Sequence, residues 1–502
     1  MNQFYSKSKI VKILIFFFLT IPLLTFSQVQ IGDDIHGEDI SDYSGGSISL
    51  SSDGSIVAIG ADRNNGNGSN SGHVRVYENT NGVWIQLGDD IDGEANQDKS
   101  GSSVSLSSDG SIVAIGAQYN DGNGNQNGHV RIFKNESGVW TQIGSDIDGE
   151  AEYDWSGSSV SLSSDGSIVA IGAGGNDGNG KGNFTGHVRI FKNELGVWTQ
   201  IGSDIDGEAE SNWSGESVSL SSNGSIVAIG AIGNEGSGHV RIFKNELGVW
   251  TQIGNDINGE ANGDNFGSSV SLSSDGSIVA IGAQYNDGNG NQNGHVRVYE
   301  NMLGNWIQIG SDIDGKDNEE LSGGSISISS DGSIIAIGAK NNSENGEFSG
   351  KVRIYKNITG VWTQIGSDLN GEGSGDFAGI SVSLSSDGSI IALGAIGNSY
   401  WDNTSYIYLT GAVRVFDLSA TLSNSSLENN YFTYYPNPVE NILNVKVIKG
   451  LELKQINIYN IQSQYLYSVR TSKIDVTNLS SGIYFFEVET NQGKSVKKIL
   501  IE

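Results

Sequence analysis

The chain has 502 residues and a formal charge of -30, with 28 Lys and Arg against 58 Asp and Glu. This balance argues against a nucleic-acid partner, because affinity for a phosphate backbone comes from basic side chains. The chain has no cysteine, which excludes disulfides, thiolate metal sites and cysteine nucleophiles. A hydrophobic content of 36% is enough for a packed core and argues against a disordered acidic polymer.

Residues 1–27 have the pattern of a signal peptide. Lys7, Lys9 and Lys12 precede an apolar run over residues 13–24, and small residues follow before position 28. The run is short for a transmembrane helix, which needs about 20 residues, although an uncleaved anchor helix is the alternative. The sequence therefore predicts export, with a mature protein that begins at Gln28.

Seven similar repeats occupy residues 28–418. The phrase Ser-Ser-Asp-Gly-Ser-Ile-Val-Ala-Ile-Gly-Ala recurs with small changes, at intervals of 52 to 58 residues. Its Asp lies at positions 53, 109, 165, 275, 331 and 387, and Asn223 replaces it in the fourth copy. Periods of this length indicate a solenoid, a propeller or an array.

Each repeat reads as four strands, as the third copy illustrates. Residues 159–163 alternate, a two-residue Asp-Gly hairpin with positive φ at both positions follows, and residues 168–171 form an apolar run expected to be buried on both faces. Residues 187–191 alternate again, and a Gly turn leads to residues 197–201. A four-stranded sheet of this kind buries both faces only between neighbours in a ring.

The two ends of the repeat region complement one another. Six repeats end in a fourth strand with the pattern Trp-x-Gln-(Ile/Leu)-Gly, but the seventh stops after its third strand at residues 413–416. Residues 28–32 read Gln-Val-Gln-Ile-Gly, which is a fourth strand without a preceding repeat. The sequence thus predicts an all-β, seven-bladed β-propeller closed by the N-terminal strand.

These repeats resemble FG-GAP repeats, the units of integrin α-chain propellers and of many bacterial secreted proteins. The resemblance rests on Gly-Ser-Ser-Val-Ser-Leu-Ser-Ser-Asp-Gly, Ile-Val-Ala-Ile-Gly-Ala and Gly-His-Val-Arg-Ile-Phe, and on the dipeptide Phe266-Gly267. It implies the propeller fold rather than an activity. Integrin-type repeats hold calcium in an extended acidic loop between their first two strands. Here that loop is a tight Ser-Ser-Asp-Gly-Ser turn, so those calcium sites are not expected.

Three residue types recur in one register, and each is expected to be structural. Arg occurs at this register position in every repeat and is expected to pair with loop carboxylates, since buried Arg needs such partners. His occurs in five repeats, with Lys351 and Ala412 in the last two, and is expected to form a structural ring rather than a metal site. Trp occurs in six and is expected to pack on outer strands. His36 and Lys316 break the register and have no evident partner in the sequence.

The linkers after the fourth strand are acidic and are a candidate for calcium. The linker at residues 145–154 has Asp146, Asp148, Glu150 and Asp154, which are close carboxylates around a Gly turn. Calcium takes six to eight oxygen ligands, so the composition fits, although the order of an EF-hand loop is missing. The alternative is a solvated acidic rim in which Asp side chains cap turns.

Variation between repeats is concentrated in the loop between the second and third strands, which is expected on the same face as the acidic linkers. The longest of these loops carries five candidate ligand-binding residues, which are Tyr400, Trp401, Asp402, Tyr406 and Tyr408. Clustered aromatic residues on a loop suggest recognition of a sugar or peptide. The alternative is that the loop packs over the last repeat.

The C-terminal region resembles the sorting domain of the type IX secretion system of Bacteroidetes. The resemblance rests on Tyr435-Pro436-Asn437-Pro438, on Leu-Ser-Ser-Gly-Ile-Tyr and on a basic Lys-Lys-Ile-Leu ending. Alternating short strands predict a small β-sandwich over residues 434–502, after a linker at 419–433. The resemblance implies export across the outer membrane and a partner in the type IX secretion machinery.

Together these patterns favour a secreted or cell-surface protein that binds a macromolecular ligand, a glycan or a protein, as in adhesion. No catalytic residue stands out, no cofactor apart from possible Ca²⁺ is indicated, and no membrane span is expected after signal removal. A secreted propeller enzyme acting on polysaccharide is the alternative, and a spacer role is a third possibility.

Overall fold

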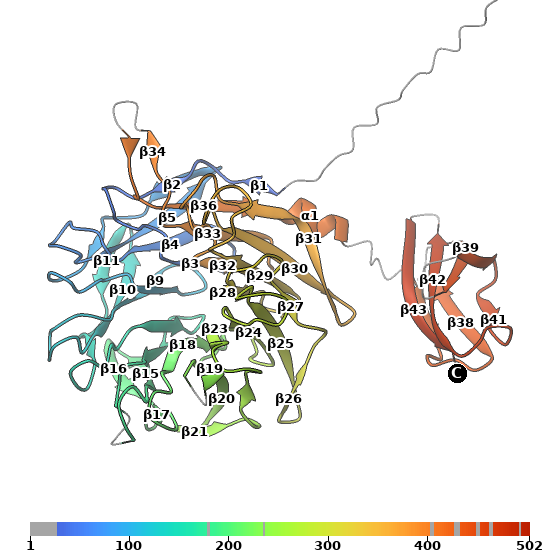
Figure 1. The fold of residues 1–502 in the computed structure, drawn as a ribbon, viewed down its shortest axis with the longest axis horizontal. Helices are drawn as coiled ribbons and strands as arrows, with labels where there is room; N and C mark the ends of the chain where they lie inside the picture. The colour runs from blue at the N-terminus through green and yellow to red at the C-terminus, as the bar shows by residue number, and fades with distance from the viewer. Residues whose placement is uncertain are drawn as a thin grey trace, which may run out of the picture.

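The computed structural model describes residues 28–177, 181–233, 236–401, 406–425, 432–447, 452–460, 465–490 and 493–501. The predicted signal peptide lies outside these residues. Within them the chain is almost entirely β-structure, and its strands form repeated antiparallel sheets. Seven such sheets, numbered I to VII here, follow one another over residues 29–417, and Figure 1 shows them arranged around a common centre.

Sheets I to III have the same five elements. Sheet I consists of β3 (Ser47–Leu50), β4 (Ile56–Ala61), β5 (His73–Thr80), β6 (Val83–Gln86) and β7 (Ile91–Asp92). Sheet II consists of β8 (Ser103–Leu106), β9 (Ile112–Ala117), β10 (His129–Glu136), β11 (Val139–Gln142) and β12 (Ile147–Asp148). Sheet III consists of β13 (Ser159–Leu162), β14 (Ile168–Ala173), β15 (His187–Glu194), β16 (Val197–Gln200) and β17 (Ile205–Asp206).

Sheets IV to VI continue this order. Sheet IV consists of β18 (Ser214–Leu220), β19 (Ile226–Ala231), β20 (His239–Glu246), β21 (Val249–Gln252) and β22 (Ile257–Asn258). Sheet V consists of β23 (Phe266–Leu272), β24 (Ile278–Ala283), β25 (His295–Met302), β26 (Asn305–Gln308) and β27 (Ile313–Asp314). Sheet VI consists of β28 (Ser322–Ile328), β29 (Ile334–Ala339), β30 (Lys351–Ile358) and β31 (Val361–Asn370).

Sheet VII joins the two ends of this region. It consists of β32 (Val382–Leu384), β33 (Ile390–Ala395) and β36 (Ala412–Asp417), with β1 (Val29–Gln30) and β2 (Ile35–His36) as its outer strands. A small hairpin of β34 (Tyr400–Trp401) and β35 (Tyr406–Ile407) lies between β33 and β36 in the chain. The helix α1 (Ser419–Ser425) follows.

The four strands expected in each repeat are present, and a two-residue strand extends the fourth position. In sheet I this extra strand, β7, pairs with the end of β5 that β6 does not reach. In sheet VI the two pieces are continuous in β31. The acidic linker therefore begins as part of the sheet, which the sequence pattern did not indicate.

The second strand of each sheet is buried on both faces, as its apolar run predicted. In β4, Val57 and Ala58 point to opposite faces of the sheet, and both are 0% exposed. The glycine of the Ile-Gly-Ala segment allows the backbone of the next repeat to approach closely. A Cβ on Gly60 would be 2.1 Å from the carbonyl oxygen of Gly101. The apolar clusters lie between successive sheets; one joins Val74 and Val76 of sheet I to Val113 and Ile115 of sheet II.

The turn between the first two strands differs from the predicted hairpin. Only Gly54 has a positive φ, of 72°, so Asp53 does not adopt the left-handed conformation expected of both residues. The reason is local hydrogen bonding. The Asp53 carboxylate accepts from the hydroxyls of Ser51 and Ser55 and from the Ser55 N–H, and Gly54 N–H donates to the Ser51 carbonyl oxygen.

Backbone hydrogen bonds close the arrangement into a ring. The N–H of Ser52 donates to the carbonyl oxygen of Ser108 in the next turn, and the same bond continues through every sheet until Ser386 donates back to Ser52, at 2.8 Å. In sheet VII, β1 pairs with β36, with Val29 opposite Asp417. The N-terminal strand thus lies where the missing fourth strand was predicted.

The C-terminal part contains two further antiparallel sheets with one apolar cluster. The first has β37 (Phe432–Tyr435), β38 (Ile442–Val447) and β41 (Lys473–Asp475). The second has β40 (Tyr465–Val469), β39 (Leu453–Asn460), β42 (Gly482–Thr490) and β43 (Gly493–Ile501). The cluster includes Leu443 and Ile474 from the first sheet and Phe486 and Ile499 from the second.

The expected linker at residues 419–433 is partly structured. Its first seven residues form α1, because Leu422 packs with buried Leu418 against the apolar cluster of sheets VI and VII. Its last residues, Phe432 and Thr433, already belong to β37, and Phe432 is only 2% exposed. The repeat region thus extends past Leu418, and the C-terminal sheets begin before residue 434.

Candidate binding face

The linkers and the loops between the second and third strands lie on one face, as predicted. In sheet I, Gly93 N–H donates to the Gly72 carbonyl oxygen at 2.8 Å, and Ser100 N–H donates to that of Ser71 at 2.9 Å. In both hydrogen bonds the donor residue lies in a linker, and the acceptor residue lies in a loop between the second and third strands. We call the surface formed by these two kinds of segment in all seven sheets the loop face.

The four carboxylates considered for calcium do not meet at one point. Asp154 is 1% exposed and caps a turn, accepting from the N–H groups of Glu150 and Ala151 at 2.9 Å. Asp148 accepts from the Asn123 amide at 2.6 Å. Asp146 belongs to a cluster with His129 and Glu150 to another with His187, so the structure divides the four residues among separate sites.

Each recurring arginine is tied to the linkers, which confirms the structural role expected for it. In sheet III, Arg189 donates to the Asp148 carbonyl oxygen at 2.6 Å and lies 3.6 Å from a Glu150 carboxylate oxygen. Its guanidinium also lies 5.3 Å from the ring centroid of Phe191. The pairs of Arg and linker carboxylate are 75 and 38, 131 and 94, 189 and 150, 241 and 208, 297 and 260, 353 and 320, and 414 and 372.

The recurring histidines and tryptophans are also built into the ring. His73, His129, His187, His239 and His295 are at most 1% exposed. Burial and the neighbouring arginine lower the pKa of His73 and of His129 to about 4, although a nearby Asp acts in the opposite direction. The tryptophans connect sheets, because the indole N–H of Trp198 in sheet III donates to the Ile143 carbonyl oxygen at 2.8 Å and the other five donate likewise.

The two residues that broke the register have partners in the structure. His36 lies opposite Ala412 in the pairing of β2 with β36, so an imidazole from the N-terminal strand faces the position where other repeats have their histidine. Burial lowers the pKa of His36, against the effect of Asp34 and Glu372. Lys316 donates its ammonium to the Gln364 amide oxygen at 2.7 Å. His36 and Lys316, although they break the sequence register, therefore both contact other residues of the repeated framework.

An aromatic cluster on the loop face was not predicted. Phe184 and Trp213 stack with their ring centroids 4.6 Å apart and an interplanar angle of 4°. Trp155 stacks on Trp213 at 5.6 Å, and Tyr119 meets the Trp155 edge at 6.1 Å. All four rings are only partly buried. We call Tyr119, Trp155, Phe184 and Trp213 the aromatic platform; it extends from sheet II to sheet IV.

A sequence signal for the platform exists in two glycines. Gly175 and Gly233 occupy the register of Tyr119, directly after the second strand of their sheets. A Cβ on Gly175 would lie 2.2 Å from the Tyr153 carbonyl oxygen and 3.1 Å from the Trp155 ring. A glycine in this register therefore leaves room for a large ring in the linker that leads into the same sheet.

The five loop residues predicted to bind ligand are only partly described. Tyr400 and Trp401 form β34 and pair with Ile407 and Tyr406 of β35. Tyr408 is 58% exposed. Asp402 lies outside the described residues. The structure thus places four of the five on one hairpin or directly after it, in the longest loop of the face.

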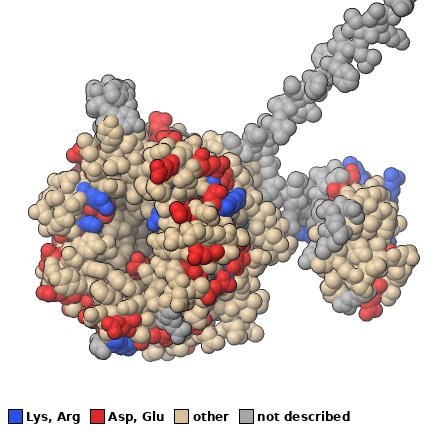
Figure 2. All heavy atoms as spheres, viewed as in Figure 1, with Lys and Arg blue, Asp and Glu red and all other residues tan. Residues whose placement is uncertain are grey.

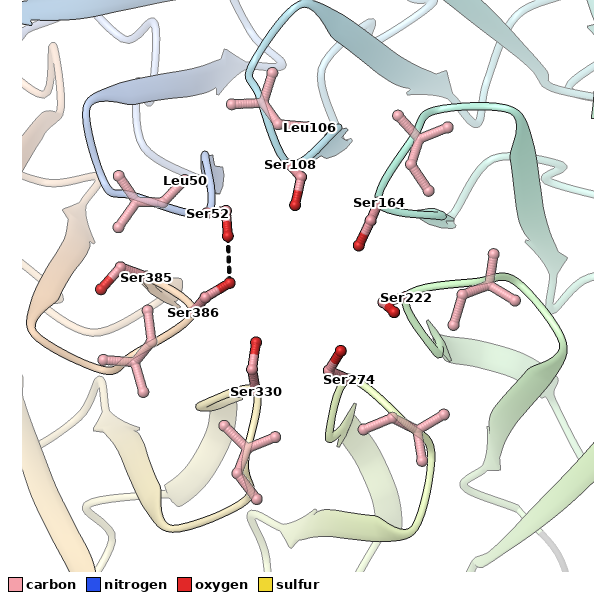
Figure 3. Close-up of a pocket in the computed structure, with 15 residues that line it drawn as sticks. Leu50, Ser52, Leu106, Ser108, Ser164, Ser222, Ser274, Ser330, Ser385 and Ser386 are labelled. Carbon is pink, nitrogen blue, oxygen red and sulfur yellow. Dashed lines mark hydrogen bonds between the residues drawn. The ribbon is translucent and has the colours of Figure 1, made fainter.

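A cavity of about 370 Å³ lies on the central axis, at the opposite end from the loop face (Figure 3). Its lining repeats around the ring and consists of Leu or Ile at one position and Ser at another, as at Leu50 and Ser52. The hydroxyl oxygens of Ser52 and Ser386 are 2.5 Å apart. Among the described residues that line this cavity there is no carboxylate, imidazole or basic side chain.

These features define the class: an all-β repeat protein with a propeller-like ring of antiparallel sheets. Comparison with known families agrees with this. Residues 258–299 match the FG-GAP repeat, and residues 433–502 match the secretion system C-terminal sorting domain. Both resemblances predicted from the sequence are thereby confirmed.

Comparison with other proteins adds similarity of shape alone. No curated protein matches the chain. Among solved structures, the periplasmic gluconolactonase of Pseudomonas aeruginosa aligns with a TM-score of 0.45 and 14% identity, over 65% of this chain and 85% of that one. The C-terminal WD40 domain of Sif2 aligns with a TM-score of 0.45 and 14% identity, over 78% of this chain and 98% of that one.

The sorting domain indicates where the protein is delivered. It indicates export, to the medium or to the outer-membrane surface, and implies an interaction with the type IX secretion machinery. The part of the chain that the structure describes contains no helix long and apolar enough to cross a membrane. Acidic side chains outnumber basic ones on the visible surface of the ring (Figure 2).

Proposed function

We propose that this exported protein binds a macromolecular ligand, a glycan or a protein, on its loop face and has no catalytic activity. The proposal takes the seven sheets as the blades of one propeller, closed by the N-terminal strand, and the C-terminal sheets as a small β-sandwich used for sorting. The ring then serves as a rigid scaffold, and the ligand contacts the segments in which the repeats differ.

The aromatic platform is the observation that carries this proposal. Its stacked rings share one face, are partly exposed and come from three successive sheets, so they are held in place by the framework rather than by a single loop. Flat aromatic surfaces bind the apolar faces of sugar rings and also anchor protein interfaces. Because the platform offers stacking area and the linkers that carry Trp155 and Trp213 are acidic in sequence, a neutral glycan is the favoured ligand.

The hairpin of β34 and β35 supplies a second contact region. It projects from the ring in Figure 1 and carries the aromatic residues of the longest variable loop. A ligand that reaches both regions would contact opposite parts of the same face. Long polymers do this readily, which is a further reason to favour an extended glycan.

The enzymatic alternative receives less support. The axial cavity is the position at which a ring of this kind would hold an active site, and its lining repeats the same Ser and aliphatic side chains. The histidines and linker carboxylates of the loop face recur from sheet to sheet, and the linker glutamates pair with the recurring arginines. A catalytic site needs a set of residues that occurs once.

The test is binding of the full-length secreted protein to glycan and protein arrays, followed by calorimetry with the best ligand. Replacing Trp155 and Trp213 together with Ala should weaken binding at least tenfold, since about 1.4 kcal/mol corresponds to a factor of ten. Tyr465→Ala, at a residue 57% exposed in the C-terminal sheets, is the matched control and should bind normally. Normal binding by the double variant would place the ligand elsewhere, and turnover of an array polysaccharide would favour the enzyme.

A further inference from the structure

A buried imidazole and two carboxylates converge in each of the first five sheets. One carboxylate comes from the linker before the sheet, the histidine begins the third strand, and the other carboxylate follows the fourth strand. In each case the three potential ligand atoms lie within 4.8 Å of one another. The sets are Glu38, His73 and Asp90; Glu94, His129 and Asp146; Glu150, His187 and Asp204; Glu208, His239 and Asp256; and Glu260, His295 and Asp312.

The geometry of the first set is that of ligands around a shared cation. Nδ1 of His73 faces Asp90 with 3.6 Å between Nδ1 and Oδ2, which is too long for a hydrogen bond. This buried nitrogen has no hydrogen-bond partner among the described residues. Two ligands of a tetrahedral zinc ion, with bonds of about 2.0–2.2 Å, lie roughly 3.3–3.6 Å apart. In the second set the same distance, from His129 to Asp146, is 3.7 Å.

The two carboxylates of the set lie on the same side of the histidine. One oxygen of Glu38 and one of Asp90 lie within 4.8 Å of each other and of a His73 ring nitrogen, so a cation placed among them would contact all three residues.

The neighbouring arginine is held to one side. Arg75 donates to the His36 carbonyl oxygen at 2.7 Å and lies 5.5 Å from the Tyr77 ring centroid, and its contact with Glu38 is 3.4 Å. Arg131, Arg189 and Arg241 make the same bonds to linker carbonyl oxygens in sheets II to IV. The arginine compensates one carboxylate of each set and leaves the Asp facing the imidazole.

Sheets V and VI show that this position accepts a cation. In sheet VI a lysine, Lys351, replaces the histidine, and its ammonium lies 3.1 Å from Asp368, the counterpart of Asp90, and bonds Glu344. In sheet V the Arg297 guanidinium bonds both Glu260 and Asp312. The later repeats thus bring a side-chain cation to the carboxylates, whereas in the first four an imidazole converges with them.

We propose that the Glu–His–Asp sets of sheets I to IV each bind one divalent cation of the zinc type, through a histidine nitrogen and two carboxylates. The imidazole selects against calcium, which prefers oxygen ligands alone, and favours zinc or another late first-row metal. Each ion would connect the preceding linker, the third strand and the end of the fourth strand. It would therefore brace the loop face.

The test measures metal retention by the full-length protein. Protein stripped with a chelator is equilibrated with Zn²⁺, freed of unbound metal and analysed for zinc per chain, and Co²⁺ is used as a second probe for its visible absorption. The parent should retain about four zinc ions. His129→Lys, which copies the residue found in sheet VI, should retain one fewer, and Asp146→Asn should do the same without changing side-chain size.

His295→Lys is the matched control, because Arg297 already bonds both carboxylates in that sheet, and it should retain as much zinc as the parent. Equal melting temperatures of the zinc-free variants would show that they fold. A parent that retains no zinc after washing, or equal losses in His129→Lys and His295→Lys, would overturn the proposal. Co²⁺ bound without the absorption change expected of a nitrogen ligand would overturn it as well.

Discussion

The backbone N–H of Ile31 donates to the carbonyl oxygen of Val415 at 2.8 Å, which ties the N-terminal strand to the last strand of the ring. The Ile31 carbonyl oxygen in turn accepts the indole N–H of Trp84 from sheet I, also at 2.8 Å. One short strand therefore connects the seventh sheet to the first. It also covers an apolar cluster formed by Ile35, Val413, Val57 and Ile59.

Removal of residues 28–33 should open the ring at this point. The deletion removes β1 and leaves the outer edge of β36 paired only with the two residues of β2. Exposed strand edges of this kind promote association between chains. We expect a broader, less cooperative thermal transition and visible aggregation in size-exclusion chromatography. Val29→Ser, which changes a side chain 58% exposed and keeps the backbone pairing, should behave as the parent. A deletion variant that melts as the parent does would contradict this closure.

The indole hydrogen bonds between sheets should have a measurable effect on stability. Trp198→Phe keeps an aromatic ring in the packing but removes the bond to Ile143, leaving its carbonyl oxygen short of one donor. A net loss of about 1 kcal/mol in the free energy of unfolding is expected for a partly buried hydrogen bond. Urea titration of the variant against Leu195→Ala, at an exposed turn next to the same strand, measures it. Equal losses in both variants would mean that the bond contributes nothing specific.

The turn aspartates predict a particular pH dependence. Burial alone would raise the pKa of Asp165, but the hydrogen bonds from Ser167 and Ser163 outweigh it and hold the pKa below its ordinary value. The same holds for Asp53, Asp109, Asp275, Asp331 and Asp387. A pKa lower in the folded than in the unfolded state stabilises the fold above the unfolded pKa, and this contribution is lost as the pH falls through the folded pKa.

Asn223 shows how to measure that contribution, because its amide oxygen accepts the same bonds from Ser221 and Ser225 without a charge. Replacing all six aspartates with Asn should lower the melting temperature at pH 7. The difference from the parent should begin to shrink as the pH falls below the ordinary Asp pKa of about 3.9, and should disappear only below the lowered pKa of the folded state. A difference that stays constant over this range would show that the charge is not involved.

The sequence predicted those features that recur within one repeat. The strand order, the doubly buried second strand and the pairing of the recurring arginines with linker carboxylates follow from periodicity and charge. The spare strand at residues 28–32 indicated the closure. The aromatic platform and the exchange between His36 and Ala412 involve contacts between different repeats. No single residue of these features stands out in the sequence. They are recognised only from contacts in space, such as the stacking of Phe184 on Trp213 and the pairing of His36 with Ala412.

Local chemistry explains the smaller departures. Asp53 was expected in the left-handed region because Asp-Gly often forms such turns. Instead, three hydrogen bonds from Ser51 and Ser55 to its carboxylate hold Asp53 in a conformation with a negative φ. The acidic linker read as a possible calcium loop because its carboxylates are close in sequence. In the folded chain Asp146 lies near His129 of sheet II, whereas Glu150 lies near His187 of sheet III. The carboxylates that are close in sequence therefore do not form one site.

The C-terminal domain should be required for export and dispensable for the ring. A chain that ends at Ser425 keeps α1, whose Leu422 packs against the cluster of the last two sheets, and should melt as the ring of the full-length protein does.

A chain that ends at Leu418 loses this packing, and we expect it to be less stable by about 1 kcal/mol, because Leu422 is partly buried and full burial of a Leu side chain contributes about 1.5–3 kcal/mol. Both chains lack the sorting domain at residues 433–502 and should remain in the periplasm of the native host, as measured by fractionation and immunoblotting. The longer chain separates the two effects, because it is folded and its retention cannot be attributed to misfolding. Delivery of the chain ending at Ser425 to the cell surface or medium at the parent's level would show that the ring itself carries the export signal.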